Sequence, residues 1–121
     1  MVKTTGRVLM NVTALHKLSY GLYVITSKKG DQFNGQIANT VFQVTSEPLT
    51  IAVSINKNNF TWEFIKESHI FTASVLSQDT PLSFIGRFGF KSGREVNKLE
   101  GINYIIGKTG APVVLENTVA Y

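Results

Sequence analysis

The chain of 121 residues, 43% of them hydrophobic, is long enough for one compact domain with a buried core. It contains no cysteine, which excludes disulfides, thiolate metal ligands and cysteine nucleophiles within the chain. Its formal net charge of +4 favours a phosphorylated ligand or an acidic protein partner, but the basic residues are scattered, so we do not expect nucleic acid binding.

No apolar stretch approaches the roughly 20 residues that a membrane-spanning helix needs. The first residues, MVKTTGR, lead into no such stretch either. We therefore expect a cytoplasmic protein with no membrane partner. The two histidines, His16 and His69, are far apart in the sequence and have no clustered carboxylates beside them. Because a metal site needs several such ligands at suitable spacing, we expect no metal.

The first expected elements are a short helix and a buried strand. Asn11 is placed to cap a helix that runs to Leu18, because apolar residues follow it at helical spacing. Residues 20–27, YGLYVITS, are apolar on both faces and rich in β-formers, which predicts a strand buried on both sides. The next residues, SKKGD, are expected to form a turn in which Gly30 supplies the permissive backbone.

A long return strand is expected from residue 32 or 33 to about Thr45, and Gly35 is expected to mark a bulge or bend in it. After Pro48, the run TIAVSIN alternates between apolar and small polar residues, as a half-buried strand does. If the polar residues of the two strands face the same side, they form one polar wall. These residues are Asn39, Gln43 and Thr45 on the first strand and Thr50, Ser54 and Asn56 on the second.

The second strand leads into a helix that is expected to start near Asn59 or Thr61. A helix start presents free backbone N–H groups and a partial positive charge, and Lys57 adds a full charge, so this geometry suits an anion. Hydroxyl groups would complete a phosphate cradle. Those hydroxyls belong to Thr45, Ser46, Ser54 and Thr61. The alternative is that Asn59 or Thr61 only caps the helix and that Lys57 is a solvated turn residue.

Beyond this helix, residues 69–77, HIFTASVLS, are expected to form another strand. Thr80 and Pro81 then predict the N-cap and the first position of a short helix that ends near Gly89. Residues 88–98, FGFKSGREVNK, form a polar, glycine-containing loop. Such a loop is either a cover over a site or a solvated connection.

The tail from Tyr104 to Tyr121 predicts a hairpin with its turn around residues 108–110, and then a final strand that Pro112 moves toward a sheet edge. Together these elements predict a mostly β, antiparallel domain with short helices, in the form of a small barrel. The sequence has no serine–histidine–acid spacing, phosphate-loop signature or dinucleotide GxGxxG motif. We therefore predict no catalytic side chain.

Five segments carry a family resemblance: LSYGLYVITS, NGQIANTVFQVTSEP, IAVSINKNNFT, FTASVLS and FGFKSGREVNK. In this order, the sequence resembles the flavin reductase-like family of FMN-binding split barrels, which includes flavoredoxins and the flavin domain of high-molecular-weight rubredoxins. The resemblance covers the chain from Ala14 onward. It implies a single domain over residues 1–121 that lacks the family's C-terminal strands.

The resemblance implies a homodimeric, antiparallel split β-barrel that holds FMN near the subunit interface. The residues that would flank the flavin ring and ribityl chain are Asn39, Thr40, Gln43, Val44 and Thr45, next to Ser46 of the phosphate cradle. Those that would hold the ribityl and phosphate end are Ser54, Ile55, Lys57 and Thr61. Ser92 and Lys98 would close over the site.

The function that the resemblance implies is an NAD(P)H-dependent reductase that passes electrons to flavin, ferric or protein acceptors, the last of rubredoxin or flavodiiron type. NAD(P)H would be the co-substrate, and the flavin rather than a side chain would supply the chemistry. One alternative is an FMN electron carrier without nicotinamide activity, as in a flavoredoxin. A remote alternative is a small basic barrel that binds single-stranded nucleic acid.

Overall fold

The computed structural model describes residues 3–4, 7–8 and 11–121. The strands are β1 (Lys3–Thr4), β2 (Arg7–Val8), β3 (Tyr23–Lys29), β4 (Gln32–Ala38), β5 (Val41–Ser46), β6 (Leu49–Val53), β7 (Thr72–Leu76), β8 (Tyr104–Ile106), β9 (Pro112–Val114) and β10 (Thr118–Ala120). The helices are η1 (Val12–Lys17), a 3-10 helix, with α1 (Phe60–Ser68) and α2 (Leu82–Gly89). The described chain is therefore mostly β with short helices. All its strand pairs are antiparallel, which confirms the predicted fold class.

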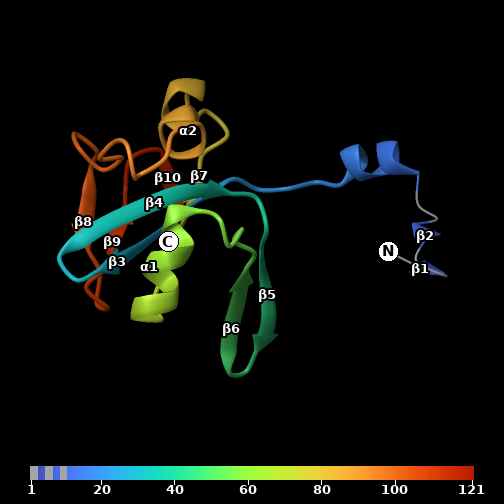
Figure 1. Ribbon diagram of the computed structural model, residues 1–121, viewed down its shortest axis with the longest axis horizontal. Helices are drawn as coiled ribbons and strands as arrows, with labels where there is room; N and C mark the ends of the chain where they lie inside the picture. Colours follow the sequence, from blue (N-terminus) through green and yellow to red (C-terminus); the bar gives the residue numbers. More distant parts are fainter. Residues whose placement is uncertain (1–2, 5–6, 9–10) are drawn as a thin grey trace.

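A four-stranded sheet in the order β10-β7-β3-β4 forms the centre of the molecule (Figure 1). Residues 24–27 of β3 are fully buried, which confirms the strand predicted to be covered on both faces. On one face, the hydroxyl of Ser74 donates to the carbonyl of Val114 at 2.8 Å. On the other face, the hydroxyl of Ser27 donates to the carbonyl of Ile70 at 2.7 Å. These bonds satisfy polar groups that burial would otherwise penalise.

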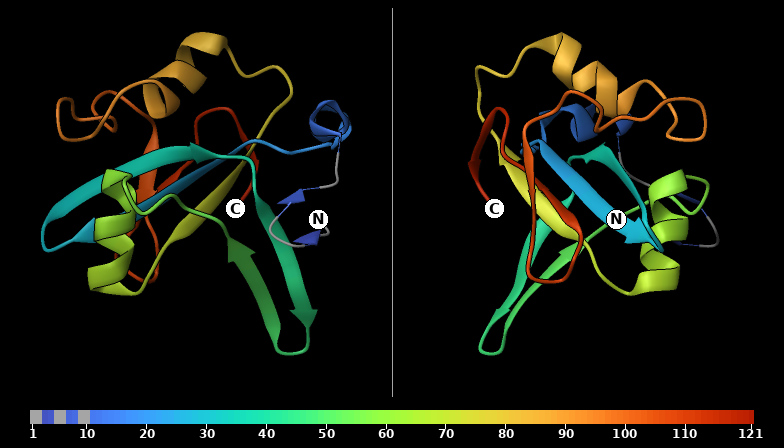
Figure 2. Two further views of the ribbon diagram at one scale, coloured as in Figure 1. Left: turned by 45° about the vertical axis from the view of Figure 1, so that its right-hand side comes forward. Right: turned by 90° about the vertical axis from the view of Figure 1, so that its left-hand side faces the viewer.

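The two α-helices cover the sheet from different sides, with α2 above it and α1 below it in Figure 2 (left). Phe84 and Phe88 lie four residues apart, so they share the face of α2 that packs on the sheet. Their rings join a core cluster with Val24 and Leu76 of the sheet. On α1, Phe64 is buried, and the helix packs against β3 and β4.

The predicted long return strand is wrong, because it divides at Asn39 and Thr40 into two strands. β4 stays in the central sheet beside β3, whereas β5 leaves it to pair with β6 in a hairpin that projects from the body (Figures 1 and 2). The predicted bulge at Gly35 is also wrong, since Gly35 lies in regular register opposite Thr26. A Cβ atom there would come within 3.0 Å of the Thr26 methyl group, so glycine permits a close approach rather than a bend.

The predicted polar wall forms only in part, because Thr45 and Thr50 lie opposite each other but Gln43 is on the other face of the hairpin. The register shifts between Gln43 and Thr45, so that Gln43 lies opposite Ile51 while Thr45 lies opposite Thr50. Ile51 and Thr50 are adjacent in β6 and point to opposite faces of the hairpin. Their partners Gln43 and Thr45 therefore point to opposite faces too. The irregularity that the sequence placed at Gly35 is found here instead.

The helix ends match the predictions in part. α1 begins directly after Asn59, as expected, and α2 ends at Gly89, as expected. The predicted cap of α2 is wrong, because Pro81 is the extended N-cap residue and Thr80 donates its hydroxyl to the carbonyl of Ser77 at 2.7 Å. Thr80 thus closes the preceding turn and cannot reach the helix.

The tail forms the predicted hairpin, because β8 and β9 pair across the turn at residues 107–111. Pro112 is the first residue of β9, which is an edge strand of the two-stranded β8–β9 sheet, as expected for a proline. β9 is nevertheless buried, and Thr72 donates its hydroxyl to the Pro112 carbonyl at 2.8 Å. The chain then turns at Asn117, and β10 joins the outer side of β7. The sequence analysis did not separate this last strand from β9.

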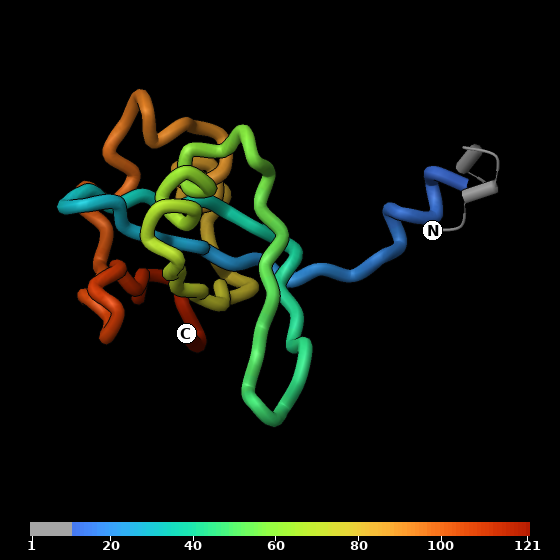
Figure 3. The backbone as a smooth tube through the Cα atoms, turned by 60° about the horizontal axis from the view of Figure 1, so that its bottom comes forward, coloured from blue at the N-terminus to red at the C-terminus, as the bar shows by residue number. Residues whose placement is uncertain are grey.

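Residues 11–20, which carry η1 and which we call the N-terminal arm, stand away from the body of the domain (Figure 3). The side chain of Asn11 accepts a bond from the Thr13 N–H at 3.0 Å, which confirms the predicted cap, although the helix is of the 3-10 type. Within residues 11–121, neither of the two α-helices is long and apolar enough to cross a membrane.

Candidate functional site

A cavity of about 310 Å³ lies between β4, the start of α1 and the loop after α2, and we call it the basic cavity. Its polar lining residues are Asn34, Gln36, Asn58, Asn59, Thr61, Lys91, Ser92, Arg94 and Lys98. Three of these side chains are cationic, Lys91, Lys98 and Arg94, of which Arg94 is paired with Glu63, and no described lining residue is acidic. The cavity is therefore built to receive a negatively charged group.

The start of α1 opens into this cavity. Asn59 occupies the N-cap position, but its side chain makes no capping bond among the described residues and instead donates to the Gln36 side chain at 3.2 Å. The hydroxyl of Thr61 accepts a bond from the Asn34 side chain at 2.8 Å. Among the described residues, no side chain accepts a bond from the N–H groups of the first turn, although the Trp62 N–H donates to the Asn59 carbonyl at 3.1 Å. The other N–H groups favour an external anion.

The loop after α2 forms the opposite wall. Ser92 begins a turn in which its hydroxyl accepts the Arg94 N–H at 3.1 Å. Gly93 packs so closely against Asn34 that a Cβ atom at this position would collide with the amide oxygen. Arg87 donates to the Lys98 carbonyl at 2.7 Å from the helix side. These contacts fix the loop against β4 and α2.

Lys98 is only 5% exposed, and its ammonium group donates to the carbonyls of Gly35 at 3.0 Å and Phe88 at 2.8 Å. Neither partner carries a negative charge, so the cation is buried without a carboxylate. Desolvation by burial lowers the pKa of Lys98 from 10.5 to about 8. A buried positive charge beside the cavity adds to its preference for anions.

Arg94 is a lining residue of the basic cavity whose side chain is partly exposed to solvent. Its guanidinium group lies 4.8 Å from the centre of the Phe60 ring and 2.9 Å from the carboxylate of Glu63. Both side chains of this ion pair are nearly half exposed, so the pair is worth little in stability.

Three of the residues predicted to bind the cofactor meet in the basic cavity: Thr61, Ser92 and Lys98. The other predicted residues lie on the β5–β6 hairpin and its connections to the body. They are Asn39, Thr40, Gln43, Val44, Thr45, Ser46, Ser54, Ile55 and Lys57. Lys57 is exposed in the turn before α1 and does not line the basic cavity. The Ser54 N–H donates to the Thr40 carbonyl at 3.1 Å, which ties the two ends of the hairpin together.

The hairpin itself carries large apolar side chains into solvent. Phe42 is 56% exposed and Leu49 is 79% exposed, and Val44 and Ile51 are also exposed. Phe42 lies opposite Ala52, whereas Ile51 and Leu49 point to the other face, so apolar side chains are exposed on both faces of the hairpin. Exposed apolar side chains on a projecting element indicate an interaction surface. In the described chain, β5 and β6 pair only with each other, so each has one unpaired backbone edge.

The sequence analysis missed several residues of the basic cavity, namely Asn34, Gln36, Asn58, Asn59, Lys91 and Arg94. Asn34 and Gln36 are two residues apart on β4, so both side chains emerge on one face. Two amide residues at this spacing in a predicted strand were the available signal, because a polar side chain that is buried in a strand needs a hydrogen-bond partner. In the described parts of the chain, no group of three or more histidine, cysteine, aspartate or glutamate residues could hold a metal ion.

Comparison with known families gives a match over residues 15–121 to the family described as "Flavin reductase like domain". The chain is 61% identical over 112 residues to a high molecular weight rubredoxin of Moorella thermoacetica, covering 93% of this chain and 49% of that protein. It is 52% identical over 111 residues to a ferric-chelate reductase (NAD(P)H) of Archaeoglobus fulgidus, covering 92% of this chain and 66% of that protein. The chain thus spans about half the length of the first relative and about two thirds of the second.

Solved structures show the same architecture. The flavoredoxin of Desulfovibrio vulgaris (Miyazaki F) superposes with a TM-score of 0.72 at 26% identity, covering 96% of this chain and 62% of that chain. An FMN-binding protein of Thermus thermophilus gives a TM-score of 0.77 at 21% identity, covering 98% and 63%. At this low identity, the second likeness concerns the fold alone.

Proposed function

The chain belongs to the flavin reductase-like family, and we propose on this premise that it binds FMN and acts as an NAD(P)H-dependent oxidoreductase. The family match confirms the resemblance drawn from the sequence. The coarser assignment, an oxidoreductase family with flavin as its cofactor, rests on that match and on the names of the relatives. The choice of FMN, the nicotinamide co-substrate and the acceptor are our proposals.

The basic cavity is the observation that carries the proposal. FMN ends in a phosphate group, and this cavity offers hydrogen-bond donors and positive charge without a carboxylate among its described lining. The N–H groups at the start of α1 and the hydroxyl of Ser92 would bind the phosphate oxygens. Lys98 would contribute its buried charge from behind them. The donor set therefore fits a phosphate monoester.

The ring and ribityl chain would follow the hairpin and its exit toward α1. This places the predicted residues of β5, Gln43 to Ser46, on the ring side and Ser54 to Lys57 on the ribityl side. Backbone N–H groups around Val44 and Thr45 would face the pyrimidine end of the ring. The register shift at this point leaves backbone groups outside the regular ladder, which supports their use as donors.

A symmetric homodimer is part of the proposal. The exposed apolar side chains of the hairpin, Phe42 and Leu49 among them, would be covered by a second copy. Such a partner would also bury the open side of the flavin ring. The expected cytoplasmic location stays a prediction.

Bound FMN would supply the redox chemistry, by taking hydride from the reduced nicotinamide and passing electrons to an acceptor. The protein would bind and orient both partners and would exclude water from the site. The ferric-chelate reductase relative supports a ferric acceptor, and the rubredoxin relative supports a protein acceptor. The flavoredoxin structure supports the second candidate function, an FMN electron carrier that does not react with nicotinamide.

Titration with FMN and with riboflavin, which lacks the phosphate, tests the placement. Asn58→Asp inserts one negative charge into the basic cavity without changing side-chain size. We expect it to weaken FMN binding by about tenfold or more, and more at low salt than at high salt, while riboflavin binding changes little. Gln78→Glu makes the same charge change in an exposed turn outside the cavity and should alter neither affinity. Equal effects of Asn58→Asp on both flavins would contradict the phosphate placement.

Oxidation of NADH or NADPH by the FMN-loaded protein under argon separates the reductase from the electron carrier. Bleaching of the flavin spectrum within the mixing time of a stopped-flow experiment is expected for a reductase. A flavin that stays oxidised with either nicotinamide, but is reduced by dithionite, would favour the carrier.

A further inference from the structure

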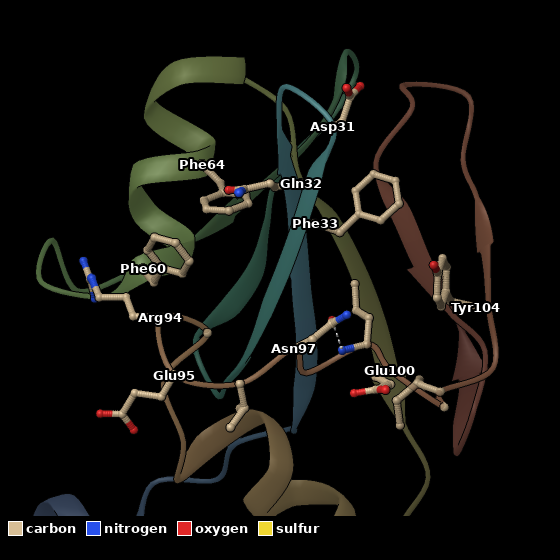
Figure 4. Close-up of a pocket in the computed structure, with 15 residues that line it drawn as sticks. Asp31, Gln32, Phe33, Phe60, Phe64, Arg94, Glu95, Asn97, Glu100 and Tyr104 are labelled. Carbon is tan, nitrogen blue, oxygen red and sulfur yellow. Dashed lines mark hydrogen bonds between the residues drawn. The ribbon is translucent and has the colours of Figure 1, made fainter.

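A second cavity, of about 760 Å³, lies along the outer edge of β4 between α1 and β8 (Figure 4), and we call it the acidic cavity. Its side walls are Phe60 and Phe64 from α1 and Phe33 and Tyr104 from the two strands. The loop of residues 93–102 closes its lower end. It shares Phe60, Gly93 and Arg94 with the basic cavity, but none of the residues predicted to bind the cofactor lines it.

Aromatic rings face the cavity from both sides. Phe60 and Phe64 lie with their ring centres 4.8 Å apart in an edge-to-face arrangement. Across the cavity, Phe33 and Tyr104 are 6.2 Å apart, also edge to face. Figure 4 shows the two pairs on opposite walls. Aromatic faces attract flat apolar groups and cations.

The charge of this cavity is opposite to that of the basic cavity. Asp31 stands at one end and Glu100 at the other, and neither belongs to the two ion pairs found within the described ranges. Glu95 also lines the cavity but points away from its middle in Figure 4. The only cationic lining residue in the described chain is Arg94, whose charge is paired with Glu63. The described lining thus carries three carboxylates and one guanidinium group, in a chain with a net charge of +4, and this balance favours a cation.

Arg94 already makes, at the Phe60 side of the cavity, the kind of contact that a bound cation would make. Its guanidinium group lies 4.8 Å from the centre of the Phe60 ring while a carboxylate holds it from the side at 2.9 Å. This is a cation–π contact with a carboxylate as counter-charge. Aromatic rings and carboxylates also line the rest of the cavity. Phe33 and Tyr104 provide a second aromatic pair, and Glu100 provides a second carboxylate at the lower end of the same cavity (Figure 4). That second position has no cation of the described chain in it.

We propose that the acidic cavity binds a small organic cation with a planar charged group, of the amidinium or guanidinium type. Its flat body would lie between the aromatic walls, and its charged end would face Glu100 or Asp31. The site is fixed in advance, because Arg87 donates to the carbonyls of Lys98 and Glu100 and thereby holds the loop that carries Glu100. A rigid wall lowers the entropy that binding must overcome.

Three probes of nearly the same shape test the proposal: benzamidinium, which is cationic, benzamide, which is neutral, and benzoate, which is anionic. The protein is titrated with each, with and without added FMN, and the amide signals of Gly101 and Ile102, which line this cavity and not the basic cavity, are followed by NMR. We expect benzamidinium to bind in the range of about 0.1 to 1 mM and benzamide to bind at least about fivefold more weakly. Benzoate should not bind. Equal affinity for benzamidinium and benzamide, or no shift at these amides, would overturn the proposal.

Glu100→Gln and Asp31→Asn locate the charge. Either change should weaken benzamidinium binding by about threefold or more and leave benzamide binding unchanged. Glu47→Gln removes one negative charge from the hairpin turn, outside the cavity, and should have no effect. A loss of affinity in the Glu47 variant as large as in the Glu100 variant would show that benzamidinium responds only to net charge, and this would also overturn the proposal. The proposal does not depend on the flavin assignment, because the probe is read at residues outside the proposed ring and phosphate positions.

Discussion

The ammonium group of Lys98 lies 3.0 Å from the carbonyl oxygen of Gly35, so a buried cation on the loop after α2 binds the edge strand of the central sheet. The same group donates to the carbonyl of Phe88 at the end of α2, where helix carbonyls lack partners. One side chain thus links β4, α2 and the loop that closes the basic cavity. An uncharged lysine still has two N–H donors, which is enough for both carbonyls.

Lys98 should make the folding stability depend on pH in an unusual direction. Its folded pKa is lowered to about 8 from 10.5, so above pH 8 the unfolded chain binds more protons at this residue than the folded chain does. The contribution of Lys98 to the free energy of unfolding therefore rises between about pH 8 and pH 10.5, by about 1 kcal/mol per pH unit at most. Urea unfolding of the wild type and of Lys98→Met at about pH 7 and pH 9.5 measures this as a difference.

Lys108→Met is the matched control, because Lys108 is exposed in the β8–β9 turn. The stability difference between wild type and this control should stay constant over the same pH range. If the Lys98→Met and wild-type stabilities ran parallel from pH 7 to pH 9.5, burial would not be lowering the pKa of Lys98.

The hydrogen bond between Asn34 and Thr61 should stabilise both the fold and the start of α1. Thr61 is only 1% exposed and accepts the Asn34 amide at 2.8 Å. Thr61→Val keeps the side-chain shape but leaves that amide without an acceptor, at a cost of about 1 to 3 kcal/mol in the free energy of unfolding. Thr61→Ser retains the hydroxyl and should cost clearly less, mainly for the lost methyl group. Denaturant unfolding measures both variants, and equal losses would mean that the bond contributes nothing.

The hairpin should carry the contact between two copies of the chain. Phe42→Asp places a charge on its exposed apolar surface and should weaken the dimer by at least about tenfold, because the charge would be buried without a partner. Leu82→Asp makes a similar change at a side chain that is 71% exposed on α2, and it should leave the dimer intact. Sedimentation velocity over a range of protein concentrations distinguishes the two. A wild-type protein that stays monomeric with FMN bound would exclude this interface.

Much of the fold could be predicted from local patterns. The buried run before Lys28, the helix after Asn59 and the tail hairpin each have a periodicity or a turn residue that fixes them. The break at Asn39 and the register shift after Gln43 have no such signal, because both alternative registers of the hairpin present an alternating pattern. The pairing of β4 with β3 ends at Ala38, and β5 then pairs with β6 in a separate two-stranded sheet.

The site was predictable only where its residues are close in sequence. Thr61 follows from the helix start, and Ser92 and Lys98 follow from the family resemblance. The position of Asn34 beside Thr61 depends on how α1 packs on β4, across 27 residues of sequence. Lys98 reaches Gly35 across 63 residues. No local pattern contains such contacts, because only the assembled layers bring the residues together.

If the protein oxidises reduced nicotinamide, its titratable side chains should matter little to the rate. His16 lies on the N-terminal arm, His69 ends α1 in the left-handed region at φ 60°, and Glu47 lies in the hairpin turn. None of the three is among the residues proposed to hold the phosphate or to flank the flavin ring, which leaves the flavin to supply the chemistry and the protein to supply position. His16→Ala, Glu47→Ala and His69→Asn, which tolerates the left-handed backbone, should therefore change turnover by less than about tenfold, short of the 10² or more expected for loss of a general acid or base. Rapid mixing with NADH, at equal FMN occupancy, measures this for each variant. A variant that keeps its FMN and loses a hundredfold in rate would identify a catalytic side chain that the proposed mechanism does not contain.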